Sequence, residues 1–177
     1  MGWKNVKEHY RIDHIVQVTD EAICIGSGYL PNLIVINPNG KIVKADVSGN
    51  EKLSRYFHDM DEDLEKLKAL IQTPDSFSAS IPVFTYDGGE IIEKRCEAPG
   101  YPNVTHDGLL MYENTFSTDR ARVVTWAKEC AAIGIRVARE RIADQQKRLD
   151  SLQQELAVAQ RNLAKLENDS PQHATEL

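Results

Sequence analysis

The chain has 177 residues, of which 41% are hydrophobic and 27% charged, and its formal net charge is −6. This composition is typical of a folded protein and excludes wholesale disorder. No apolar run approaches the roughly 20 residues that cross a bilayer, and the first residues lack the basic-then-apolar pattern of a signal peptide. The three cysteines are far apart and form no CxxC pair, which argues against a disulfide framework. We therefore expect a cytoplasmic protein with no membrane partner.

The charge is divided unevenly along the chain. The first 116 residues carry a net charge of −7, whereas the rest carry +1. Proteins that bind duplex nucleic acid usually present a concentrated basic face. The acidic first part therefore argues against direct binding to duplex DNA or RNA.

Residues 9–47 have the pattern of a small antiparallel meander. Apolar residues alternate from Ile12 to Val18 and again at Ile23 and Ile25, and residues 33–36 form a short apolar run suited to a buried strand. The sequence Asn-Pro-Asn-Gly at 37–40 supplies turn chemistry before a return strand at 41–44. Four strands joined by short turns are therefore expected here.

The next segment changes to a helical period. Apolar residues recur at steps of three and four from Leu53 to Ile71, which predicts an amphipathic helix. Asn50 is suited to cap its start, and Pro74 lies just beyond its end. The acidic residues 61–63 are expected to divide the stripe into two shorter helices, with Asp61 as the second cap.

A second hairpin is predicted at residues 81–95, because two apolar strands flank Asp87-Gly88-Gly89. Between Cys96 and Thr118 the periodicity disappears, and proline and glycine stand among aromatic and polar residues. A stretch of this length without periodicity is often a functional loop.

From about Thr118 onward the sequence predicts one long helix, because no proline occurs until Pro171. Ser117 or Thr118 is expected to cap the start of this helix. Its first turns are expected to pack on the preceding domain, with Cys130 as a small buried residue. Some 50 helical residues would extend about 75 Å, which exceeds an ordinary globular helix several-fold. Something besides its own helix propensity must support it.

The strongest signal is a heptad repeat in this helix. With Ile135 at position a, nine of the ten a and d positions up to residue 166 are apolar, which predicts a coiled coil. The residues expected to mediate oligomerisation are Ile135, Ile142, Gln145, Leu149, Leu152, Leu156, Leu163 and Leu166. Within one chain, the long helix could fold back on the amphipathic stripe of residues 53–71, but that stripe is too short to cover the whole apolar face. We therefore expect a homo-oligomer, most simply a dimer.

The orientation of the helices stays open from the sequence. In a parallel pair, the contacts between g and e′ positions contain no opposite charges, so they add little specificity. Gln145 at a d position is the single polar core residue and is suited to fix the register. An antiparallel pair is the alternative.

These patterns predict an α+β fold. We expect a β-rich α+β head over residues 1–116 with one or two short helices, a long helix over 117–167 with heptads from about 135, and a disordered tail over 168–177.

The loop between residues 96 and 118 is the best candidate for binding. It combines aromatic rings with amides and hydroxyls, the materials of a recognition surface. The candidate residues, with two arginines at the helix start, are Tyr101, Asn103, Thr105, His106, Asp107, Tyr112, Asn114, Arg120 and Arg122. The alternative is a structural loop whose tyrosines cover the core.

Two further hypotheses concern the same residues. The tyrosines with Arg120 or Arg122 would suit a sponge for a nucleotide-like signal, because guanidinium groups and a helix N-terminus favour phosphate. His106 and Asp107 would serve a small hydrolase as an acid–base pair. No spacing completes a metal site or a known catalytic arrangement, so the sequence predicts no metal, no cofactor and no enzymatic activity.

The opening residues 2–12 and the segment 87–118, with Pro102-Asn103-Val104-Thr105-His106-Asp107-Gly108, resemble a group of small proteins encoded by phages and prophages of Gram-negative bacteria. No activity is assigned to this group. The resemblance implies an accessory gene of a mobile element, acting in the cytoplasm of a bacterial host. It makes a non-enzymatic role in counter-defence, through capture of a host protein, the leading hypothesis.

Overall fold

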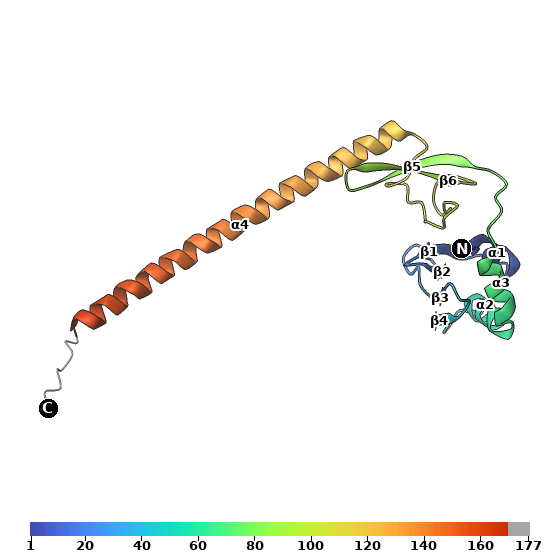
Figure 1. The fold of residues 1–177 in the computed structure, drawn as a ribbon, viewed down its shortest axis with the longest axis horizontal. Coiled ribbons are helices and arrows are strands. Elements are labelled where there is room, and N and C mark those ends of the chain that lie inside the picture. Colours follow the sequence, from blue (N-terminus) through green and yellow to red (C-terminus); the bar gives the residue numbers. More distant parts are fainter. Residues whose placement is uncertain (170–177) are drawn as a thin grey trace, which may run out of the picture. The chain divides into compact units, whose positions relative to one another are not determined.

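The computed structural model describes residues 1–169 and confirms the α+β class (Figure 1). The chain divides into two compact units, one over residues 1–128 and a second that begins at Glu129. The first unit holds both sheets, the short helices and the first turns of the long helix. The second is the remainder of that helix.

The predicted meander is present as a four-stranded antiparallel sheet in the order β1-β2-β3-β4. Its strands are β1 (Ile15–Thr19), β2 (Ala22–Gly26), β3 (Ile34–Ile36) and β4 (Ile42–Ala45). Val16 pairs with Ile25, and Ile23 pairs with Ile36, so the alternating apolar residues lie on one buried face. In the pairing of β3 with β4, the register shifts between Val35 and Ile36.

A short N-terminal helix, α1 (Trp3–His9), is an addition to the predicted elements. With it the described chain has three short helices, not one or two. The backbone N–H of Gly2 donates to the carbonyl of Ile71, which places the start of α1 against the end of α3 (Leu64–Gln72). Trp3 and Val6 are buried there. Seven residues with two buried side chains make a weak periodic signal, and tertiary contacts stabilise this helix.

The helical stripe forms two helices, as predicted, but with a different second cap. The first helix, α2 (Glu51–Glu62), is capped by Asn50, whose side chain accepts from the N–H of Leu53 at 3.1 Å. The second, α3, is capped by Asp63, which accepts from the N–H of Lys66 at 2.9 Å. The prediction of Asp61 as this cap is wrong, because the chain leaves the helical conformation at Asp63.

The main core lies between the meander and the three short helices. It is built from the inward residues of the sheet and the apolar stripes of α1, α2 and α3. Its fully buried members include Val6, Ile23, Ile25, Ile34, Ile36, Tyr56, Met60 and Leu67.

The second hairpin consists of β5 (Ile81–Asp87) and β6 (Glu90–Cys96), joined by the predicted glycine turn. Val83, Cys96 and Met111 form a smaller core beneath it. The N–H of Val18 donates to the carbonyl of Gly108 at 2.8 Å, which connects the loop after β6 to β1. A Cβ at Gly108 would collide with the side chain of Val18, and its φ of +88° also favours glycine.

The long helix is α4 (Arg120–Asp169). Asp119 caps it instead of Ser117 or Thr118, because its carboxylate accepts from the N–H of Ala121 at 2.8 Å. Val123 is buried, as expected, whereas Cys130 is exposed and its predicted burial is wrong. Residues 168 and 169 of the predicted tail are helical, and 170–177 lie outside the described residues. Among residues 1–169, no helix combines the length and hydrophobicity needed to cross a bilayer.

Candidate functional site

Two of the predicted binding residues, Tyr101 and Tyr112, lie together on the surface of the first unit. Their rings stack with centroids 6.0 Å apart and an interplanar angle of 24°. The hydroxyl of Tyr112 donates to the carbonyl of Gly28 at 3.3 Å, and a Cβ at Gly28 would collide with the hydroxyl of Tyr101. The turn after β2 therefore packs against this pair of tyrosines.

That turn carries two large exposed side chains, Tyr29 and Leu30, that no sequence pattern singles out. Tyr29 is 96% exposed and Leu30 is 59% exposed, beside the half-exposed Tyr101 and Tyr112. We name Tyr29, Leu30, Tyr101 and Tyr112 the aromatic patch. Aromatic side chains gathered on a surface are typical of protein–protein contact sites.

His106 has structural partners. Its ring stacks on Phe77 with centroids 3.8 Å apart and an interplanar angle of 8°. Its Nε2 lies 3.0 Å from the carbonyl oxygen of Ala79 and must carry the proton, because a carbonyl only accepts. Its own carbonyl accepts from Nε1 of Trp3 at 3.0 Å. His106 thus joins α1, the segment before β5 and the loop after β6.

Asp107 also has structural partners, and they differ from those of His106. Its carboxylate accepts from the Lys94 ammonium and from the hydroxyl of Thr105, which is fully buried. These two hydrogen bonds outweigh the effect of burial and lower the pKa of Asp107. No hydrogen bond or ion pair joins the side chains of His106 and Asp107 within the described residues, so the geometry does not present them as an acid–base pair.

The remaining predicted residues of the loop and helix start do not complete a phosphate site. Arg120 and Asn114 are exposed, and the guanidinium of Arg122 lies 4.8 Å from the ring centroid of Trp126. The carboxylate of Asp119 already occupies the N–H groups at the start of α4. Because that carboxylate satisfies the donors that an anion would use, the helix start is not an open phosphate site.

A cavity of about 420 Å³ lies between α1, β1 and the loop after β6. Its apolar lining includes Trp3, Ile12 and Val16, and the loop contributes Pro102 and Asn103. We name this cavity the α1 pocket. Of the predicted binding residues, only Asn103 lines it.

Both signs of charge surround the α1 pocket. Lys7 and Arg11 supply cations, and neither makes an ion pair with any residue in 1–169. Lys4 and Glu97 are paired with each other at 2.8 Å. Glu8 and Asp13 also line the pocket, and they pair with Lys4 at 3.5 Å and with Lys52 at 2.6 Å. The pocket thus offers an apolar floor and two cations without an ion-pair partner, which suits a small anionic ligand with an apolar body.

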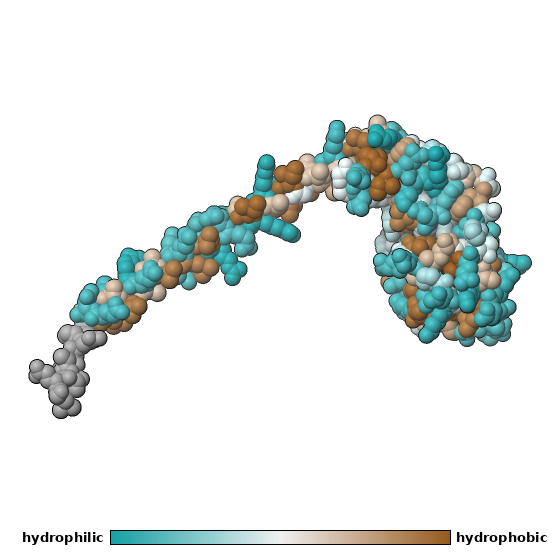
Figure 2. Space-filling view, in the orientation of Figure 1, coloured by the Kyte–Doolittle hydropathy of each residue, from teal (hydrophilic) through white to brown (hydrophobic). Residues whose placement is uncertain are grey.

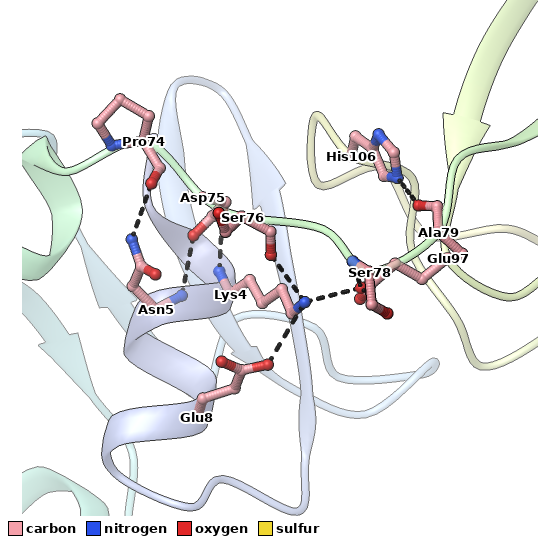
Figure 3. A network of polar contacts seen from close by, with 10 residues as sticks. All are labelled: Lys4, Asn5, Glu8, Pro74, Asp75, Ser76, Ser78, Ala79, Glu97 and His106. Carbon is pink, nitrogen blue, oxygen red and sulfur yellow. Dashed lines mark hydrogen bonds and ion pairs between the residues drawn. The ribbon is translucent and has the colours of Figure 1, made fainter.

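The Lys4–Glu97 pair, which lines the pocket, is the centre of a polar network (Figure 3). The Lys4 ammonium also donates to the carbonyl of Ser76 at 2.8 Å, and Glu97 accepts from the N–H of Ser78 at 2.6 Å. The carboxylate of Asp75 accepts from the N–H of Lys4 at 3.1 Å. Three segments that are distant in the sequence meet at this point.

Hydrogen bonding shifts the acid–base behaviour of this pair. The bond from Lys4, followed by those from Ser78, lowers the pKa of Glu97 to about 2 despite its partial burial. Burial by itself would lower the pKa of Lys4, but its contacts with Glu97 and Glu8 raise it above its ordinary value. Both groups therefore remain charged over the physiological pH range.

Local sequence patterns do not reveal the α1 pocket, and the reason is the shortness of α1. Lys4, Lys7 and Arg11 recur at steps of three and four, but they lie in a segment too short to predict as a helix. A helical wheel drawn over residues 2–11 would have placed these three cations on one face. Nothing in the sequence indicated that Glu97 lies beside them.

The predicted oligomerisation residues recur at heptad spacing along α4. Figure 2 shows hydrophobic side chains, in brown, recurring along this helix. We name the face of the predicted oligomerisation residues the seam. Its seven leucine and isoleucine side chains are between 48% and 68% exposed: Ile135, Ile142, Leu149, Leu152, Leu156, Leu163 and Leu166. Gln145 is exposed on the same face. A soluble helix seldom leaves so regular an apolar face in water.

Among residues 1–169, no group of three or more His, Cys, Asp or Glu side chains could hold a metal ion. Comparisons with protein-family models, curated proteins and solved structures found no match.

Proposed function

We propose that this chain is a non-enzymatic binding protein that assembles through its long helix. The observation that carries the proposal is the seam, in which large apolar side chains recur at heptad spacing and are 48% to 68% exposed. Covering the exposed half of one leucine or isoleucine contributes about 1 kcal/mol, so fourteen in a dimer contribute on the order of 10 kcal/mol. A second copy of the chain carries the same seam, so the apolar side chains of each helix can pack against those of the other along its length.

The aromatic patch is the surface that we propose for the captured partner. Tyr29 is almost completely exposed, and the stacked rings of Tyr101 and Tyr112 hold the neighbouring surface in place. Tyrosine contributes a large contact area at a small cost in side-chain entropy, which is why it is frequent at binding hot spots. Two heads in one assembly would also gain avidity.

The resemblance to phage and prophage proteins suggests the setting. In the cytoplasm of a bacterial host, we propose that the protein acts in counter-defence by capturing a host defence protein. The structural roles of His106 and Asp107 support a binding role over a hydrolytic one, because neither side chain is free to act on a substrate.

Assembly is tested by light scattering on the full chain at micromolar concentration. We expect a homo-oligomer, and we expect a variant with Leu149→Glu and Leu156→Glu to be a monomer because two charges per chain would enter the seam. A single-copy species for the unmodified chain would overturn the proposal. Val158→Glu, which changes an equally exposed residue outside the a and d positions, is the matched control.

Capture is tested by affinity purification from a bacterial lysate. We expect one protein to be retained by the full chain and lost from a variant with Tyr29→Ala and Tyr112→Ala. Tyr29 is almost completely exposed, so Tyr29→Ala by itself, which does not disturb the contact of Tyr112 with Gly28, should weaken retention while circular dichroism shows an intact fold. Equal retention by the full chain and the double variant would exclude the aromatic patch as the capture surface.

A second candidate function is sequestration of a nucleotide-like signal, and the α1 pocket favours it. The volume of about 420 Å³ suits a small ligand, and Lys7 and Arg11 would pair with phosphate. Thermal-shift measurements against a panel of nucleotides test this function. A shift that disappears in Arg11→Ala but persists in Arg122→Ala would support the α1 pocket, whereas flat responses would exclude the sponge.

A further inference from the structure

The charged residues beside the seam divide into two halves along α4. The e and g positions flank the a and d positions and make the contacts between paired helices. In the first half they carry Arg139, Arg141 and Arg148, whereas in the second half they carry Glu155 and Glu167. All five side chains are exposed.

From this division we infer that two copies of α4 pair in an antiparallel coiled coil, with Leu149 of each chain facing Leu152 of the other. The inference rests on the proposed assembly through the seam and adds its orientation and register. In this register, the numbers of two core residues that face each other across the pair always add up to 301. Each of the ten a and d positions therefore faces an a or d position of the other chain, whose residues are marked with a prime. The partner is a second copy of this chain.

The edge contacts of this register are favourable. Antiparallel helices bring g positions next to g′ positions, and the closest pair at the centre is Arg148 with Glu155 of the other chain, formed twice by symmetry. Neither side chain has an ion-pair partner within residues 1–169 of its own chain. The next pairs outward, Arg141 with Asn162′ and Arg139 with Gln160′, contain no like charges.

Other registers are less favourable. Sliding the helices by one heptad in one direction places Ile135 and Ala138 opposite positions beyond Asp169 of the other chain. Sliding them in the other direction places Leu163 and Leu166 opposite Ala131 and Lys128 of the other chain, so a leucine meets a lysine. Each slide also brings either the two copies of Arg148 or the two copies of Glu155 opposite each other. Like charges in direct contact oppose pairing, so the same two residues that favour the central register exclude its neighbours.

Packing of the seam favours the same arrangement. In the antiparallel pair Ile142 faces Ala159′ and Leu163 faces Ala138′, so a large side chain meets a small one. In a parallel pair each alanine would face its own copy and leave the layer underfilled. Gln145 is the one core residue that favours the parallel pair. There its amide could form hydrogen bonds with the amide of Gln145′, whereas in the antiparallel pair it faces the apolar Leu156′.

The two arrangements differ greatly in one distance that can be measured on the unmodified chain. Cys130 is exposed, whereas Cys24 and Cys96 are buried, so a thiol-reactive spin label should modify Cys130 alone. In the antiparallel register the two Cys130 residues lie 41 helical positions apart, which is about 60 Å. In a parallel dimer they lie side by side, within about 20 Å.

Pulsed electron paramagnetic resonance on the labelled full chain therefore tests the inference, with Cys130→Ser as the labelling control. A dimer with a distance near 60 Å supports it. A dimer with a short distance, or an oligomer of more than two chains, overturns the antiparallel pair but leaves assembly through the seam intact. A monomer overturns both.

Charge reversal provides an independent test of the register. Arg148→Glu and Glu155→Arg each replace two attractive pairs by two repulsive ones, and we expect each to weaken the dimer about tenfold. Mixing the two variants should restore affinity, because the mixed dimer again pairs arginine with glutamate. In a parallel dimer these residues would face Gln153′ and Gln160′, so unchanged affinity in both variants would refute the register.

Discussion

Shortening one leucine at the centre of the seam should weaken assembly by a predictable amount. Leu149 is 48% exposed in the single chain, and covering that surface contributes about 1 kcal/mol. Leu149→Ala removes most of this contribution from both chains and leaves a cavity against Leu152′, for a total of about 2–3 kcal/mol. Since 1.4 kcal/mol corresponds to a factor of ten, the dissociation constant should rise roughly 30- to 100-fold.

Sedimentation equilibrium on the full chain measures this change. Alanine has a higher helix propensity than leucine, so the substitution does not weaken the helix itself. Val158→Ala is the matched control, because Val158 is also 48% exposed in α4 but lies at a c position. An unchanged dissociation constant in Leu149→Ala, or an equal loss in Val158→Ala, would refute the assignment of the seam.

Two further predictions concern the first unit. Because the pKa of Glu97 is lowered to about 2 in the folded protein, its contribution to stability is complete above pH 4.5 and is lost as the pH falls towards 2. Urea unfolding at pH 6 and pH 3 should therefore show a smaller acid loss in Glu97→Gln than in the unmodified chain, and equal losses would contradict the pairing with Lys4. The hydroxyl of Tyr10 is buried and has no hydrogen-bond partner among residues 1–169, so Tyr10→Phe should raise the free energy of unfolding by about 1 kcal/mol. A loss of stability on urea unfolding would show that this hydroxyl has a favourable partner.

Elements encoded by local patterns were predictable. The glycine turn at 88–89 and the apolar alternation on both sides specify the hairpin, and the structure places its strands where the pattern does. The heptads likewise indicated which face of α4 is apolar, and those side chains are exposed in the single chain. In both cases the signal lies within a few residues of the element it describes.

The candidate sites were only partly predictable. The sequence singled out the loop that carries Tyr101 and Tyr112, but their neighbour Tyr29 lies about 70 residues earlier, in what reads as an ordinary turn. The sequence indicated His106 as a candidate acid–base group. In the structure its ring stacks on Phe77 and its Nε2 donates to the carbonyl of Ala79. A side chain selected for its chemistry can serve packing, and only its contacts distinguish the two roles.

By itself, the sequence determined the strands, the helical stripes, the turn positions and the apolar face of the long helix, because periodicity and turn chemistry act between near neighbours in the chain. Tertiary structure alone decided that α1 forms, that Lys4 meets Glu97 and that the turn at Tyr29 joins the two tyrosines of the loop. These contacts join residues about 70 to 90 positions apart. They depend on how the elements pack together, and no local pattern records that.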